Sequence, residues 1–136
     1  KLEKENIHPK HVILLQPTSP LRSKNLIDKG FQEFIKNKSY SSLIHLGSQK
    51  HFTGSIINNV WKPDFNEETR SQDIPLKYVP TGCLFIYKVK DTIKRDSLLG
   101  LKPYALLEKT NHWINIDYEI DLIFFKAMLD NKILKV

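Results

Sequence analysis

The chain has 136 residues, of which 40% are hydrophobic and 26% charged, and this balance predicts one globular domain rather than a disordered segment. Its net charge of +6 suits an anionic partner, such as a nucleotide, a nucleic acid or an acidic sugar, without choosing among them. A single cysteine, Cys83, excludes an internal disulfide, and no apolar run approaches the ~20 residues of a membrane helix, so a cytoplasmic protein is expected.

Apolar patterning predicts a strand, a helix and a second strand in the first third of the chain. Residues 11–16 form a continuous apolar run typical of a buried strand, and the prolines that follow end it. Residues 24–37 place apolar side chains at helical spacing, with Ser23 as the expected N-cap. Residues 41–46 form the second strand. This order predicts a crossover unit of parallel strands.

The rest of the chain continues the alternation. Residues 55–61 contain two apolar runs around an Asn-Asn pair, which predicts a hairpin. The polar residues 62–77 are expected to form a long loop, and such loops are often functional. The remaining predicted elements are a strand at 82–87, a helix at 91–99 closed by Gly100, a strand at 103–107, an extended stretch at 113–117 and a helix at 118–129.

This order of elements predicts an α/β layered domain, in which ligands bind outside the carboxyl ends of the strands. Residues 16–22, residues 47–51, Asn115 and Asp117 are expected at that edge. The sequence contains no Walker A loop, no Gly-x-Gly-x-x-Gly motif, no nucleophile elbow and no histidine pair with metal-ligand spacing.

Two polar segments carry a chemical signal. Residues 16–22, QPTSPLR, place amide, hydroxyl and guanidinium groups after a strand, which fits a polyhydroxylated anionic ligand or a proline-stiffened turn. In an extended stretch Asn115 and Asp117 point to one face, where their oxygens could hold Mg²⁺ beside a triphosphate. Alternatively, Asp117 caps the last helix, and Glu119 and Asp121 favour its dipole.

Several segments resemble one enzyme family. Residues 14–22, LLQPTSPLR, resemble a signature of the acylneuraminate cytidylyltransferases, the CMP-sialic acid synthetases and their relatives acting on legionaminic, pseudaminic and similar nine-carbon acids. Residues 70–75 and 80–86 are similar to that family's Arg-Arg-Gln-Asp-Leu-Pro and Asn-Gly-Ala-Ile-Tyr-Ile segments, with Ser71 and Thr81 as departures. Residues 113–117 resemble its Asp-Ile-Asp metal motif, with Asn115 replacing the first aspartate.

The resemblance implies a Rossmann-like three-layer α/β/α fold of the nucleotide-diphospho-sugar transferase type, with a mixed sheet. Residues 1–136 would form a single domain, the carboxyl-terminal portion of the catalytic domain without its N-terminal strands. The family's loop that cradles the CTP triphosphate has no counterpart in the sequence, so the isolated chain is expected to be inactive. Residues 52–80 correspond to a hairpin insertion that would form a homodimer. Exposed Trp61 and Phe65 would suit that interface, and core packing would explain these two residues equally well.

The implied reaction joins CTP and a nine-carbon acidic sugar into a CMP-sugar with the help of Mg²⁺. Asp117 and Asn115 would be the catalytic metal ligands. The implied substrate-binding residues are Gln16, Ser19, Arg22, Arg70, Gln72, Thr81 and Gly82. Two other interpretations stay open, namely a non-catalytic module that binds a sugar acid or nucleotide, and a basic nucleic-acid binder, which rests on the net charge alone.

Overall fold

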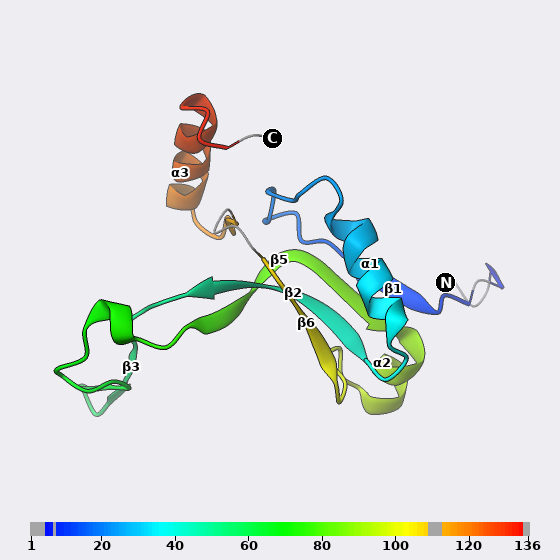
Figure 1. Cartoon of the computed structure of the whole chain (residues 1–136), viewed down its shortest axis with the longest axis horizontal. Helices are drawn as coiled ribbons and strands as arrows, with labels where there is room; N and C mark the ends of the chain where they lie inside the picture. Colours follow the sequence, from blue (N-terminus) through cyan, green and yellow to red (C-terminus); the bar gives the residue numbers. More distant parts are fainter. Residues whose placement is uncertain (1–4, 7, 109–112, 135–136) are drawn as a thin grey trace.

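The structure, a computed structural model, describes residues 5–6, 8–108 and 113–134 of the chain (Figure 1). Strands and helices alternate along it, which confirms the predicted α/β class. None of the described helices is both long and apolar enough to cross a membrane. The elements are β1 (His11–Leu14), α1 (Leu26–Lys36), β2 (Ser42–Gln49), β3 (Gly54–Ile57), β4 (Val60–Pro63), the 3₁₀ turn η2 (Ser71–Asp73), β5 (Lys77–Lys88), α2 (Val89–Arg95), β6 (Pro103–Leu107) and α3 (Glu119–Asp130).

The main sheet is mixed, as predicted, and has the strand order β1-β5-β2-β6. The long strand β5 runs antiparallel to both of its neighbours, β1 and β2, whereas β6 runs parallel to β2. Strands β1, β2 and β6 therefore share one direction, and their carboxyl ends lie at one edge of the sheet. The predicted parallel crossover from β1 through α1 to β2 is present, with β5 between the two strands.

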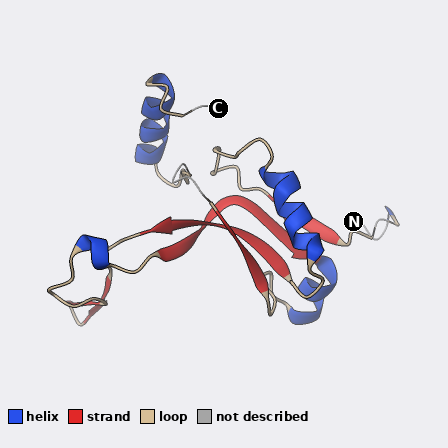
Figure 2. Ribbon diagram, viewed as in Figure 1, coloured by secondary structure: helices blue, strands red, loops and turns tan. Residues whose placement is uncertain are grey.

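Helix α1 covers one face of the sheet (Figure 2). Phe34 of α1 packs there in one cluster with Leu43 of β2 and with Leu84 and Ile86 of β5. Since strand side chains alternate between faces, Phe85 belongs to a separate cluster, with Ile44 and Tyr87. The arrangement is compatible with a Rossmann-like fold, and packing of α1 holds the loop before it above the carboxyl edge.

Three local predictions are wrong. The first strand is not buried: Val12, Ile13 and Leu14 are 45%, 40% and 42% exposed, because β1 pairs only with β5 and forms an edge of the described sheet. Ser23 does not cap α1, which begins at Leu26 after Asn25. Gly100 does not close α2, because that helix ends at Arg95 and Asp96 adopts the left-handed conformation.

A projecting arm, residues 52–76, extends from the sheet beyond β2 and β5 (Figure 1). It contains η2 and the predicted hairpin, in which β3 pairs with β4. Asn58 and Asn59 both have positive φ angles, 51° and 63°, as a type I′ turn requires. Asp64 fastens the arm to β5, since Lys77 Nζ donates to its carboxylate at 2.6 Å, and this hydrogen bond lowers the pKa of Asp64.

Candidate functional site

The carboxyl edge of the sheet brings together three segments that lie far apart in the sequence. The backbone amide of Gln16 donates to the Gly82 carbonyl of β5 at 3.0 Å, and the backbone amide of Ile116 donates to the Thr18 carbonyl at 2.8 Å. Trp113 packs over β2 so closely that a Cβ on Gly47 would lie 2.2 Å from its indole nitrogen. The structure thus places residues 16–22 beside the Asn115–Asp117 stretch, as the parallel-sheet argument predicted, and it adds Gly82, which was named only through the resemblance.

Ser19 joins these three segments through its hydroxyl. The Oγ atom donates to the Thr81 carbonyl at 2.8 Å and lies 3.2 Å from Asn115 Oδ1. Ser19 is 0% exposed, so its one proton is shared between the buried Thr81 carbonyl and the half-buried Asn115. Ser19 therefore holds the edge together from beneath rather than facing a substrate.

Gly82 allows the first loop to approach β5. Its φ angle is +74°, and a Cβ there would lie 2.1 Å from Ser19 Oγ and 2.3 Å from Gln16 Oε1. Only glycine fits both this conformation and this space. The carboxamide of Gln16 consequently lies against the Gly82 backbone, in a half-buried position from which it can still reach a ligand.

Arg22 fixes the loop to the sheet. Its Nε atom donates to the Cys83 carbonyl at 3.0 Å, and its Nη2 atom donates to the Gln16 carbonyl. The Cys83 thiol donates to the Leu21 carbonyl at 3.1 Å, and burial raises the pKa of this thiol. The guanidinium thus donates its hydrogen bonds to backbone carbonyls. Cys83 stays a protonated packing residue rather than a nucleophile.

Asp117 lies at the exposed end of the third segment. It does not cap α3, because the carboxylate of Asp121 accepts from the backbone amides of Asp117 and Tyr118 at 3.0 and 2.9 Å. The alternative capping role therefore falls to Asp121. The Asp117 carboxylate instead accepts a hydrogen bond from Asn115 Nδ2 at 2.6 Å.

This donor set fits a magnesium ion only in part. Within the described ranges no three His, Cys, Asp or Glu side chains cluster as metal ligands. Mg²⁺ is commonly bound by one or two carboxylates with substrate phosphates and water, so Asp117 fits as a single protein ligand. Asn115 does not fit in its present orientation, since its amide nitrogen faces Asp117 and its oxygen faces Ser19.

Thr81 lies in a buried network beneath the edge. Its hydroxyl is 2.6 Å from His45 Nδ1, and His45 Nε2 is 3.2 Å from Glu108 Oε2. Burial lowers the pKa of His45, although the nearby Glu108 opposes that shift. Thr81 is 0% exposed, so in this structure it supports the edge from inside. The sequence analysis did not single out Glu108, whose only signal was its position directly after a strand.

Arg70 and Gln72 lie elsewhere, on the arm. Arg70 is exposed, and its Nε atom donates to Asp73 at 2.9 Å, while the Gln72 carbonyl accepts from Lys50 at 2.6 Å. Figure 1 places η2 beside β3, away from β1 and α1. The structure does not bring these two predicted substrate-binding residues next to Gln16 and Gly82 of the same chain.

Comparison with known proteins supports a relationship with cytidylyltransferases of nonulosonic acids. The chain is similar to two pseudaminic acid cytidylyltransferases of Campylobacter jejuni subsp. jejuni, at 26% identity over 132 residues for serotype O:23/36 and 25% over 132 residues for serotype O:2. Each alignment covers 93% of this chain and 57% of the relative. The chain therefore spans a little over half the length of these curated relatives. No family model matches the chain.

Gly82→Ala is expected to destabilise the chain by roughly 1–2 kcal/mol because of its positive φ angle, and also to displace Ser19 and Gln16. Gly100→Ala is the matched control, since Gly100 also has a positive φ, +67°, but its Cβ would meet Ser41. Urea denaturation measures the stability loss in both variants. NMR shifts of the Ser19 and Asn115 amides should change only in Gly82→Ala, and unchanged shifts there would contradict the close packing of the edge.

His45 should make stability fall on the acidic side of its ordinary pKa of 6.5, because its pKa is lowered in the folded chain. Below that pH the unfolded chain binds more protons than the folded chain, so the free energy of unfolding decreases as the pH falls. His45→Gln should flatten part of this slope in denaturation series at several pH values. His51→Gln, at an exposed position, controls for loss of an imidazole, and an unchanged slope in His45→Gln would refute the expectation.

Proposed function

We propose that the chain is part of a cytidylyltransferase that forms a CMP-sugar from CTP and a nine-carbon acidic sugar of the sialic, legionaminic or pseudaminic type. The observation that carries this proposal is the meeting of three family-like segments at one carboxyl edge, through the contacts of Ser19 with Thr81 and Asn115. The similarity to pseudaminic acid cytidylyltransferases over 93% of the chain supports the same reaction class.

In the proposed reaction the anomeric hydroxyl of the sugar attacks the α-phosphorus of CTP. A sugar oxygen–phosphorus bond forms, the bond to the bridging oxygen breaks, and pyrophosphate leaves. The protein contributes mainly position and electrostatic stabilisation. Gln16, held over Gly82, would orient the sugar through its carboxamide. Asp117 would hold Mg²⁺, which when bound neutralises phosphate charge.

Of the two arginines predicted to bind substrate, Arg22 is committed to backbone carbonyls and is a poor partner for the sugar carboxylate. Arg70 is exposed on the arm. We therefore propose a homodimer in which the arm contacts the second copy. Large apolar side chains support this assignment, since Ile56 is 75% and Trp61 is 54% exposed on the hairpin.

A second candidate is a module that binds the sugar acid or nucleotide without catalysis. The hydrogen bond from Asn115 to Asp117 favours it, because this contact occupies an oxygen that a metal ion would need. The two candidates differ in whether pyrophosphate is released. The test therefore measures pyrophosphate release and CMP-sugar binding on the same preparations.

The decisive assay mixes CTP, Mg²⁺ and pseudaminic acid with the protein encoded by the whole reading frame that contains this chain. Release of pyrophosphate that depends on both substrates supports the cytidylyltransferase. A thermal shift with the CMP-sugar but no pyrophosphate release supports the binding module. If the protein shows neither pyrophosphate release nor a thermal shift, both assignments are refuted. Sialic and legionaminic acids, tested in parallel, identify the preferred sugar.

Asp117→Ala is expected to lower turnover by about a hundredfold or more, because the proposed metal loses its carboxylate, while helix content stays unchanged. Asp121→Ala is the matched control and should show the reverse: about 1 kcal/mol less stability of α3, measured by circular dichroism, since two backbone amides lose their acceptor. Wild-type turnover in Asp117→Ala would exclude its metal role.

Ile56→Lys should convert the proposed dimer into a monomer, because a charge in the buried centre of an interface is costly. Sedimentation velocity measures the change. Ile93→Lys is the control, since Ile93 of α2 is also 75% exposed but lies outside the arm. A dimer that persists in Ile56→Lys, or that dissociates equally in both variants, would speak against the arm as the interface.

A further inference from the structure

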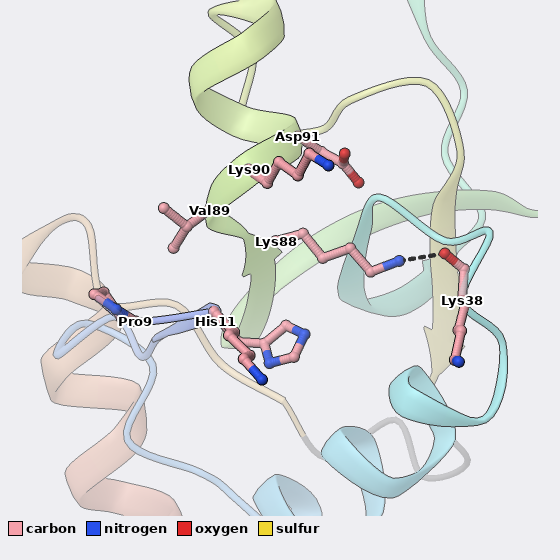
Figure 3. Close-up of a pocket in the computed structure, with 8 residues that line it drawn as sticks. Pro9, His11, Lys38, Lys88, Val89, Lys90 and Asp91 are labelled. Atoms are coloured by element: carbon pink, nitrogen blue, oxygen red, sulfur yellow. Dashed lines mark hydrogen bonds between the residues drawn. The ribbon is translucent and has the colours of Figure 1, made fainter. Parts of the chain in front are cut away.

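A basic hollow lies at the end of the sheet opposite the carboxyl edge (Figure 3). Its volume is about 460 Å³, which is within the usual range for small-molecule sites. The polar and charged residues that line it are Lys10, His11, Lys38, Lys88, Lys90 and Asp91. They come from the start of β1, the turn after α1, and the junction of β5 with α2, so the fold itself gathers them.

The hollow carries a concentrated positive charge. Four lysines line it against a single carboxylate, that of Asp91. Lys88 is held in place, since its Nζ atom donates to the Lys38 carbonyl and lies 5.5 Å from the centre of the Phe34 ring. Lys10, Lys38 and Lys90 are exposed, and Figure 3 shows the Lys88 side chain reaching the backbone carbonyl of Lys38.

The imidazole of His11 lines the hollow beside these lysines. Its ring packs edge-on against Phe31 and Phe34, with centroid distances of 5.6 and 5.7 Å. Burial lowers the pKa of His11, and the charges of Lys88 and Lys10 lower it further. The imidazole thus lies where a further positive charge is disfavoured and a negative charge is attracted.

We propose that this hollow binds a small phosphate-bearing anion with at least two negative charges. Lysine ammonium groups act as compact point charges that suit phosphate, whereas the set contains no arginine for planar, bidentate binding of a carboxylate. An anion would also relieve the repulsion among four like charges. This site is separate from the proposed catalytic edge and does not depend on the proposed function.

The test titrates the chain with inorganic pyrophosphate at low ionic strength. Calorimetry measures the binding, and NMR shifts of the backbone amides locate it. Saturable binding that shifts the amides of His11 and Val89 is expected. Lys38→Ala combined with Lys90→Ala should weaken it about tenfold, at roughly 0.7 kcal/mol for each ion pair. Lys24→Ala combined with Lys29→Ala is the control, because it removes the same charge from exposed lysines that do not line the hollow.

Four outcomes would overturn the proposal. Equal weakening of pyrophosphate binding in both double variants would show a general attraction to the basic surface. Competition by an oligonucleotide, to an equal extent in both double variants, would show a nucleic-acid surface. Shifts confined to Asn115 and Asp117 would place the anion at the other edge. Absence of saturable binding would remove the site altogether. Repeating the titration with Asp117→Ala separates the two proposals, since the hollow should bind pyrophosphate whether or not the catalytic assignment survives.

Discussion

The buried hydroxyl of Ser19 is the contact on which the carboxyl edge depends. It reaches the Thr81 carbonyl and Asn115 at once, so one side chain connects the loop after β1, strand β5 and the segment after β6. A buried hydrogen bond contributes only about 1 kcal/mol net, but a carbonyl left unpaired in the interior costs more. The absence of a side chain on Gly82 makes this approach possible, so the edge rests on a serine and a glycine together.

The sequence was sufficient to place residues 16–22, Asn115 and Asp117 at one edge, because the order of strand, helix and strand predicts parallel strands and the polar residues follow those strands. It could not predict that β1 would be exposed, since an apolar run looks the same in a central strand and at an edge. The pairing of His45 with Glu108 was missed for a related reason: it depends on β2 and β6 being neighbours, a non-local choice. Arg70 was assigned to the site by resemblance, which implied a homodimer through residues 52–80 but not which chain's Arg70 would reach the site.

The Asn115–Asp117 pair shows how one replacement changes a site's chemistry. Two carboxylates at these positions would repel each other, and a divalent cation would relieve that repulsion. An asparagine removes the repulsion and donates its own hydrogen bond to Asp117, so this edge is stable without a cation. Metal binding must then compete with an existing contact, and the phosphates of a substrate become the main source of the ion's remaining ligands.

The two ends of the sheet differ in how their charges are balanced. At the carboxyl edge, the positively charged Arg22 donates to backbone carbonyls and the negatively charged Asp117 accepts from an amide, so this edge carries charges of both signs. At the opposite end, four lysines and one aspartate line the hollow, and the Lys88 ammonium donates to the Lys38 carbonyl. Like charges held close together raise the free energy of the folded chain. The lysines gathered at this end show that the net charge of +6 is unevenly distributed. The proposed anion site therefore lies at an end with an excess of lysines, away from the edge where the motifs meet.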